Sequence, residues 1–260
     1  MRYLFILSTA FLFLFLFSSC KKENVQHEKP AITKIKLGEM VTSQNLKATM
    51  WSDDSIATGY HKLYLSVTDA SGNDVNNATM DVLPLMKMSM MTHSSPFEKP
   101  VYNPALKLYE FAVVFTMPSG SDSWSVKATI NGEDQTFNIA VPVAKTKLVG
   151  SYVGTDGSKY VVSLIPLKKW EVGLNDIKIL VNKMADMMTF PAMDGLNIQM
   201  TPEMPSMGHG SPNNVNPTSI DGGYYKGRVN YTMTGDWRIH FKIRKGDVVI
   251  IDDAYIDILF

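Results

Sequence analysis

The chain has 260 residues, and its 25 basic and 25 acidic side chains give a net charge of zero. A neutral chain lacks the basic surface that nucleic acid requires, so we expect no nucleic-acid partner. Cys20 is the only cysteine, which excludes a disulfide framework, a thiolate metal site and a cysteine nucleophile. The chain is rich in methionine, with 17 residues, and a thioether is both a flexible apolar filler and a soft metal ligand.

The N-terminal segment has the pattern of a secretory signal. Arg2 supplies a positive charge, residues 3–17 are almost all apolar, and the small pair Ser18-Ser19 precedes Cys20. The apolar run is shorter than the roughly 20 residues that a membrane-spanning helix needs, so a retained anchor is the weaker interpretation. A cysteine directly after small residues resembles a lipobox, which implies a lipid on Cys20. A plain secretory signal is the alternative.

We therefore expect residues 1–19 to be a lipoprotein signal peptide and residues 20–32 to be a short polar tether that ends near Pro30. The tether resembles the charged stretch after the cysteine in lipoproteins of the Bacteroidetes type. The expected location is the cell envelope, with a lipid anchor in a bacterial membrane, the outer membrane by preference. The periplasmic and the surface-facing orientation both stay open.

Beyond the tether, apolar residues recur with a period of two, and turn residues separate the apolar runs. Asn131-Gly132 is a strong hairpin signal. This pattern predicts an all-β fold of two immunoglobulin-like β-sandwiches in tandem. The expected strands include residues 63–67, 111–117, 125–130, 136–141, 160–164, 177–181, 228–233, 238–243 and 248–251.

The two halves of the chain match each other, which indicates a tandem duplication. The first copy spans residues 33–145 and the second residues 146–260, and each has about the length of one immunoglobulin-like sandwich. When His93 is aligned with His209 without a gap, the matched pairs are Met88 and Met204, Met91 and Met207, Ser95 and Ser211, Tyr109 and Tyr225, and Val113 and Val229. Trp124 falls on Trp237 after a three-residue shortening, and Gly59 falls on Gly173 upstream.

Both copies contain the pattern M-x-x-M-x-H, whose sulfur and imidazole donors suit copper, with Cu(I) favoured as thioethers accumulate. Hard ions such as Ca²⁺ prefer oxygen ligands, which the segment barely offers. The candidate metal ligands are Met204, Met207 and His209 in the second copy, and Met88, Met91 and His93 in the first.

The geometry of the segment depends on a turn between its two methionines. Along a single strand, Met91 and His93 share a face while Met88 points to the other. Pro205-Ser206 predicts a turn that gathers the three ligands in the second copy, whereas the first copy has Ser89-Met90 there. The alternative is that these methionines fill the space between two sheets and the histidines lie on the surface. The first copy leaves the two interpretations nearly balanced.

Three segments of the second copy resemble the YtkA-like family, which is related in style to FixH-like and CopC-like domains. They are residues 204–209 (Met-Pro-Ser-Met-Gly-His), residues 222–225 (Gly-Gly-Tyr-Tyr) and residues 234–239 (Thr-Gly-Asp-Trp-Arg-Ile). The resemblance covers about 70 residues of the second copy and is looser in the first. It implies small exported β-sandwiches that handle copper, with no established catalytic activity.

We expect no enzyme, because the sequence shows no Ser-His-Asp spacing, phosphate loop or HExxH motif. The leading hypothesis is a membrane-anchored protein of the envelope that binds or delivers copper and meets a copper-donating or copper-accepting protein. The alternative is an envelope module without metal whose two sandwiches bind a protein partner.

Overall fold

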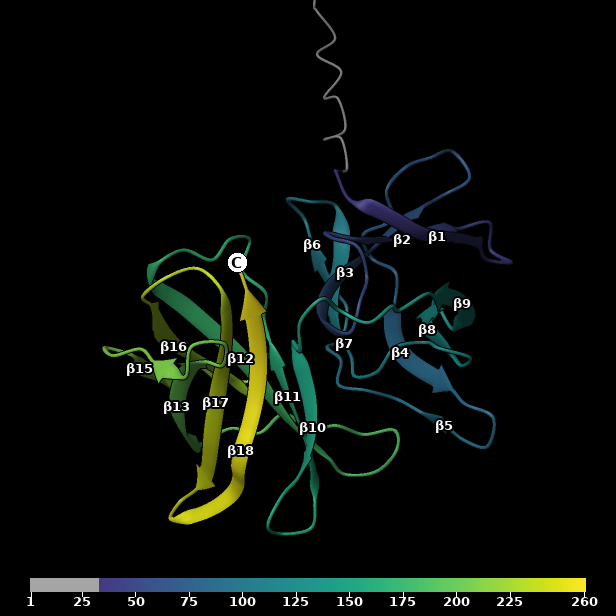
Figure 1. The fold of residues 1–260 in the computed structure, drawn as a ribbon. Helices are drawn as coiled ribbons and strands as arrows, with labels where there is room; N and C mark the ends of the chain where they lie inside the picture. The colour runs from purple at the N-terminus through teal and green to yellow at the C-terminus, as the bar shows by residue number, and fades with distance from the viewer. Residues whose placement is uncertain (1–32) are drawn as a thin grey trace, which may run out of the picture. The chain divides into compact units, whose positions relative to one another are not determined.

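The computed structural model describes residues 33–260, and the regular elements in this range are all strands (Figure 1). The expected signal peptide, tether and acylated Cys20 lie outside the described residues. Within residues 33–260, no helix of the length and apolarity needed to cross a membrane is found. The protein is all-β, as the period-two pattern predicts, and every strand segment expected from the sequence overlaps a strand of the structure.

The first copy consists of a five-stranded and a four-stranded antiparallel sheet. The five-stranded sheet has the order β1-β2-β3-β7-β6, and the four-stranded sheet has the order β5-β4-β8-β9. The strands are β1 (Ile35–Val41), β2 (Lys47–Ser52), β3 (Gly59–Thr68), β4 (Met80–Lys87), β5 (Thr92–His93), β6 (Val101–Asn103), β7 (Leu108–Phe115), β8 (Ser123–Ile130) and β9 (Glu133–Ile139).

The second copy repeats this arrangement strand for strand. Its sheets have the orders β10-β11-β12-β16-β15 and β14-β13-β17-β18, which are the orders of the first copy shifted by nine strands. The strands are β10 (Val149–Val153), β11 (Lys159–Leu164), β12 (Gly173–Met184), β13 (Leu196–Met204), β14 (His209–Gly210), β15 (Val215–Ser219), β16 (Tyr224–Tyr231), β17 (Asp236–Lys245) and β18 (Val248–Leu259).

The strand register also agrees between the copies. Leu65 of β3 lies opposite Tyr109 of β7, and Ile179 of β12 lies opposite Tyr225 of β16, as the duplication predicts. Asn131 and Gly132 have φ angles of 49° and 85°, so the hairpin turn predicted between β8 and β9 is present. The chain is therefore two immunoglobulin-like β-sandwiches in tandem.

Each copy packs the inner faces of its two sheets around a tryptophan. Trp124 lies in the apolar cluster of the first copy, and Trp237 lies in that of the second. Alternation of inward apolar and outward polar residues along β8, β13, β16 and β17 accounts for these clusters.

A third, smaller cluster joins the copies. Val114 of β7 packs with Val149, Val161 and Leu180 of the second copy. Beside this cluster the Tyr224 hydroxyl donates a hydrogen bond to Glu98, and the Tyr60 hydroxyl lies 3.2 Å from the Tyr224 oxygen. Burial raises the pKa of Tyr60 to about 12, so this contact is made by neutral phenols.

Candidate metal-binding hairpins

In the second copy, Met204 and His209 lie directly opposite each other across the β13–β14 hairpin. The backbone N–H groups of Met207 and Gly208 donate to the Met204 carbonyl at 3.1 and 2.9 Å, which closes a tight loop over residues 205–208. Gly208 has a φ of 63°, a conformation that glycine adopts without a steric penalty. The turn predicted at Pro205-Ser206 is therefore confirmed, and it places the side chains of Met204 and His209 on one face.

The His209 ring is held by two contacts. Its Nδ1 donates a hydrogen bond to the Gly210 carbonyl at 3.0 Å, because a carbonyl oxygen only accepts. Its ring meets the Trp237 ring edge-on, with 5.9 Å between ring centroids and 77° between ring planes. With the proton on Nδ1, the neutral imidazole presents the Nε2 lone pair, which is the form that binds a metal ion.

His93 in the first copy has the same environment. Its Nδ1 donates to the Ser94 carbonyl at 2.7 Å, and its ring meets Trp124 at 5.9 Å and 89°. Trp124 and Trp237 are held in turn, because their indole N–H groups donate to the carbonyls of Met117 and Met233 at 2.9 and 3.0 Å. Both tryptophans belong to the core clusters, so each histidine ring rests on a fixed side chain.

The residue opposite His93 is Met86, which corrects the alignment made from the sequence. The gapless alignment pairs Met88 with Met204, but Met86 holds the position of Met204 in the structure. Pro84-Leu85-Met86 matches Pro202-Glu203-Met204 in the same register against β8 and β17. The first hairpin has two more residues between the methionine and the histidine than the second. A gapless alignment on the two histidines therefore cannot pair Met86 with Met204.

Met88 and Met91 form the last pair of the first hairpin. The Met88 N–H donates to the Met91 carbonyl at 2.9 Å, so Ser89 and Met90 make a two-residue turn. Met90 at the tip is 93% exposed, so it lies beyond the end of β4 and does not share a strand face with Met86 and Met88. Because alternate pairs of a hairpin share a face, Met88, Met91 and His93 lie together on one face.

Met204 and Met207 differ in exposure. Met204 is 4% exposed and belongs to the core cluster, whereas Met207 in the loop is 59% exposed. Ser206 anchors this loop by donating from its hydroxyl and its backbone N–H to Asp236. These hydrogen bonds hold the pKa of Asp236 below its ordinary value. The structure thus pairs Met204 with His209 and places Met207 at the rim.

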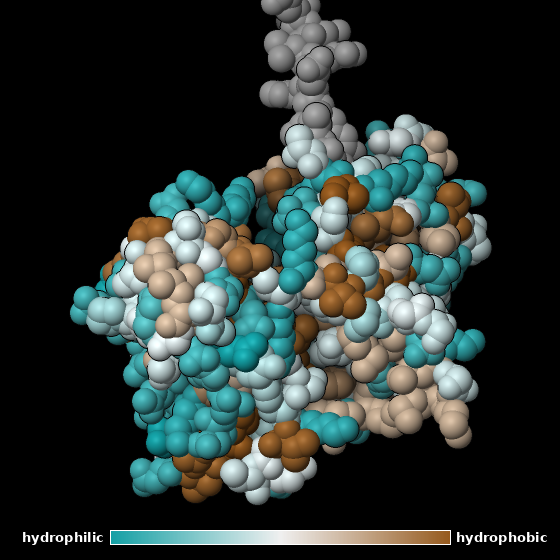
Figure 2. All heavy atoms as spheres, in the orientation of Figure 1, coloured by the Kyte–Doolittle hydropathy of each residue, from teal (hydrophilic) through white to brown (hydrophobic). Residues whose placement is uncertain are grey.

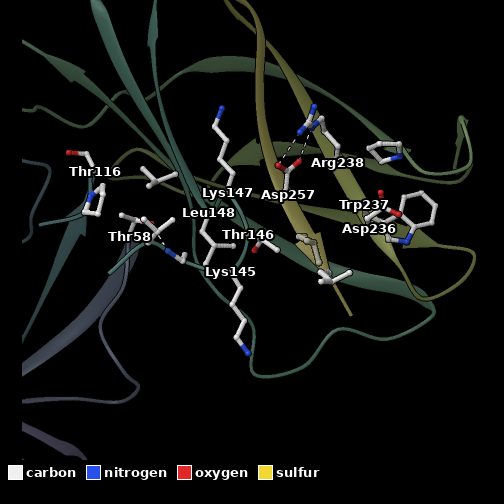
Figure 3. Close-up of a pocket in the computed structure, with 17 residues that line it drawn as sticks. Thr58, Thr116, Lys145, Thr146, Lys147, Leu148, Asp236, Trp237, Arg238 and Asp257 are labelled. Atoms are coloured by element: carbon white, nitrogen blue, oxygen red, sulfur yellow. Dashed lines mark hydrogen bonds and ion pairs between the residues drawn. The ribbon is translucent and has the colours of Figure 1, made fainter. Parts of the chain in front are cut away.

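A cavity of about 560 Å³ lies beside the second hairpin (Figure 3). Pro205, Asp236 and Trp237 line one end, and the segment between the copies, which includes Lys145 and Lys147, lines the other. Arg238 in its lining is paired with Asp257, and the Lys147 ammonium lies 3.4 Å from the Tyr255 ring centroid. The lining contains no methionine or histidine, so the cavity adds no soft donor to those of the hairpin.

The described part of the chain contains no cluster of the side chains that usually bind Zn²⁺ or Ca²⁺. Residues 33–260 contain no group of three His, Cys, Asp or Glu side chains suited to a metal ion. The donors of the two hairpins are of another kind, thioether and imidazole, a set that fits Cu(I) better than Zn²⁺ or Ca²⁺.

No protein-family model matches the chain, and no curated protein matches its sequence. Among solved structures, the chain is similar to InvD of Yersinia pseudotuberculosis, with 13% identity and a TM-score of 0.27 over 80% of this chain and 54% of InvD. The Escherichia coli adhesin FdeC has 13% identity and a TM-score of 0.25 over 85% of this chain and 66% of FdeC. The bacterial integrin-binding protein invasin has 15% identity and a TM-score of 0.24 over 83% of this chain and 39% of invasin.

The chain spans about half the length of InvD and less than half that of invasin. The activities in these names belong to those proteins. At these TM-scores the likeness carries no argument about function, and the assignment of two β-sandwiches rests on the sheet topology described above.

Proposed function

We propose that the protein binds Cu(I) through its two histidine–methionine hairpins and acts as a copper-binding or copper-delivery protein of the cell envelope. One observation carries the proposal: in both copies a methionine lies opposite a histidine whose Nδ1 is tied to a carbonyl and whose ring contacts a tryptophan. If the methionines only filled the core, the histidines opposite them would not need the same ring orientation in both copies. A copper-handling role also agrees with the resemblance to YtkA-like domains.

The chemistry of the donors supports Cu(I) in particular. Thioether sulfur is soft and uncharged, and Cu(I) has a low charge that two or three neutral donors satisfy. Zn²⁺ favours thiolates, imidazoles and carboxylates, which these hairpins do not combine. The proposed role of the protein is to hold and hand over the ion, without a catalytic step.

The test is a Cu(I) titration under anaerobic conditions with a chromophoric chelator as competitor. The protein is residues 33–260, which form one compact unit. We expect two Cu(I) ions per chain in the parent and none held tightly after His93→Ala and His209→Ala together. His240→Gln is the matched control, since His240 contacts Asp253 and Glu203 and lies outside both hairpins. Unchanged binding in the double variant refutes the proposal.

The proposal includes a lipid anchor on Cys20, for which the residue pattern before that cysteine is the support. Replacement Cys20→Ser is expected to release the protein from the membrane fraction into the soluble fraction. A Cys20→Ser protein that stays with the membrane after washing without detergent counts against the anchor. It leaves the copper proposal untouched, because the hairpins lie in residues 33–260.

A second candidate function is a protein-interaction module, and the exposed tips of the hairpins favour it. Met90 is 93% exposed and Met207 is 59% exposed, and apolar side chains at loop tips suit a contact with another protein. On the face shown in Figure 2, however, strongly apolar residues are scattered among polar ones and form no large patch. A docking site for a protein on this face would therefore be small.

Crosslinking in intact cells tests this second candidate, with a photoreactive residue in place of Met90. A single crosslinked species that persists in copper-free medium and in the variant lacking both histidines supports an interaction module. Loss of the species under either condition assigns the contact to copper exchange.

A further inference from the structure

The first hairpin carries more soft donors on one face than the proposed function requires. Its pairs are Met86 with His93, then Lys87 with Thr92, then Met88 with Met91. Alternate pairs point to the same side of a hairpin, so Met86, Met88, Met91 and His93 share a face while Lys87 and Thr92 point to the other.

Burial decreases along this face from the core to the tip. Met86 is 1% exposed, Met88 and His93 are half-buried, and Met91 is 50% exposed. A buried sulfur at the base excludes water from one side of an ion, and exposed Met91 leaves the other side open for entry. Three thioethers and one imidazole therefore lie on one face that is buried at its base and open at its tip.

The second hairpin is two residues shorter and lacks a counterpart of the pair Met88 and Met91. It ends at the pair Met204 and His209, and a loop of four residues takes the place of the pair Met88 and Met91. Only Met207 remains as a further sulfur, on a loop that Asp236 anchors through Ser206. The two copies therefore differ in donor number although they share the histidine and the tryptophan.

We infer that the first copy binds Cu(I) with three thioether sulfurs and one imidazole nitrogen, with Met86 as the third sulfur, and that it fills before the second copy. The inference rests on the proposed function, which requires only that the hairpins bind copper. An extra soft donor on a preformed face adds affinity without further ordering of the chain.

The experiment isolates the first site with His209→Ala in residues 33–260. In this background Met86→Leu is expected to weaken Cu(I) binding at least about tenfold, which corresponds to about 1.4 kcal/mol. Leucine keeps the apolar volume, so the change removes the sulfur and leaves the packing. Met50→Leu is the matched control, because Met50 is a fully buried methionine of the same core cluster that lies outside the hairpin. Met90→Leu controls for the exposed tip, and neither control is expected to change the affinity more than about twofold.

X-ray absorption of the copper-loaded His209→Ala protein counts the sulfurs without a change at Met86. Three sulfurs and one nitrogen are expected, and two sulfurs overturn the inference even where Met86→Leu fails to fold. Equal affinities of Met86→Leu and Met50→Leu also overturn it. Copper that binds His93→Ala but not His209→Ala refutes the inference and leaves the proposed function standing at the second copy. An absence of copper binding in the parent refutes the proposed function itself.

Discussion

The hydroxyl of Tyr225 ties β16 to the start of β13, since it accepts a hydrogen bond from the Leu196 N–H at 3.0 Å. The same hydroxyl donates to the Met193 carbonyl at 2.6 Å. Tyr109 does the same in the first copy, where it accepts from the Ala78 N–H at 2.9 Å and donates to the Val75 carbonyl. Each tyrosine thereby fixes the start of a strand, β4 or β13, and the other end of that strand carries a candidate methionine ligand.

We expect Tyr225→Phe to lower the free energy of unfolding by about 1–3 kcal/mol, because two backbone groups lose their partner. Tyr231→Phe is the matched control in the same strand. The Tyr231 hydroxyl is buried, and within the described residues it has no hydrogen-bond partner, so its removal should be neutral or slightly stabilising. Urea unfolding of residues 33–260 measures both effects, and a cost for Tyr231→Phe as large as that for Tyr225→Phe would contradict this assignment.

The tyrosine pair and the tandem fold are visible in the sequence because they rest on local signals. Period-two apolar runs predict strands, and the near-constant spacing of tyrosine, valine and tryptophan between the halves predicts the duplication. The short and edge strands are harder to see, since β5 and β14 have only two residues each and leave no periodicity to detect.

The candidate ligands of the first hairpin are only partly predictable from the sequence, for a physical reason. The sequence selects Met88, because its spacing to His93 equals that of Met204 to His209, whereas cross-strand pairing depends on the length of the turn between them. The pattern Pro-x-Met at residues 84–86 and 202–204 was the available signal for Met86. Contacts between the copies, such as Val114 with Leu180, depend on tertiary packing and leave no periodic signature.

The copies are expected to fold separately but to lose stability when separated, and Val114 tests this. In residues 33–260 Val114 is 1% exposed and packs with residues of the second copy. Val114→Ala should therefore cost about 1–2 kcal/mol there and much less in residues 33–145 alone, where that partner surface is missing. Thermal unfolding of both proteins measures the difference, and residues 146–260 are unfolded alone in the same way. The absence of a cooperative transition in either isolated copy would show that the two sandwiches fold as one domain.

His240 should make stability depend on pH. Partial burial lowers its pKa, but the hydrogen bonds to Asp253 and Glu203 outweigh burial and raise the pKa above the ordinary value of 6.5. A raised pKa in the folded state means that the stabilisation is complete below the unfolded pKa and is lost as pH rises through the folded pKa.

Replacement His240→Gln should therefore cost stability at about pH 5.5 and little at about pH 8.5. The difference is expected to be about 1 kcal/mol or less, because the pair is partly exposed. Urea unfolding at the two pH values measures it, with the parent as reference at each. A cost that is equal at both values would assign His240 a packing role instead.

Gly235 leaves the space that the Met204 side chain occupies. A Cβ atom at position 235 would overlap the methyl carbon of Met204, and Gly235 has a φ of 141°, which other residues rarely adopt. We expect Gly235→Ala to lower the free energy of unfolding by about 1–3 kcal/mol and to weaken Cu(I) binding at the second hairpin, because Met204 must move away. Gly246→Ala is the control for backbone strain, since its φ is also positive and an added Cβ would meet open space.

A double-mutant cycle separates the overlap from the strain. If the overlap dominates, Met204→Ala removes the group that is struck, and the pair Gly235→Ala and Met204→Ala should cost at least about 1 kcal/mol less than the sum of the single changes. The pair Gly246→Ala and Met204→Ala should be additive, because Gly246 lies at the far end of the β17–β18 hairpin. Additivity in both pairs would mean that Gly235 matters only for its backbone conformation. In that case the loss of copper binding in Gly235→Ala would have to come from the loop around Asp236 and not from a displaced Met204.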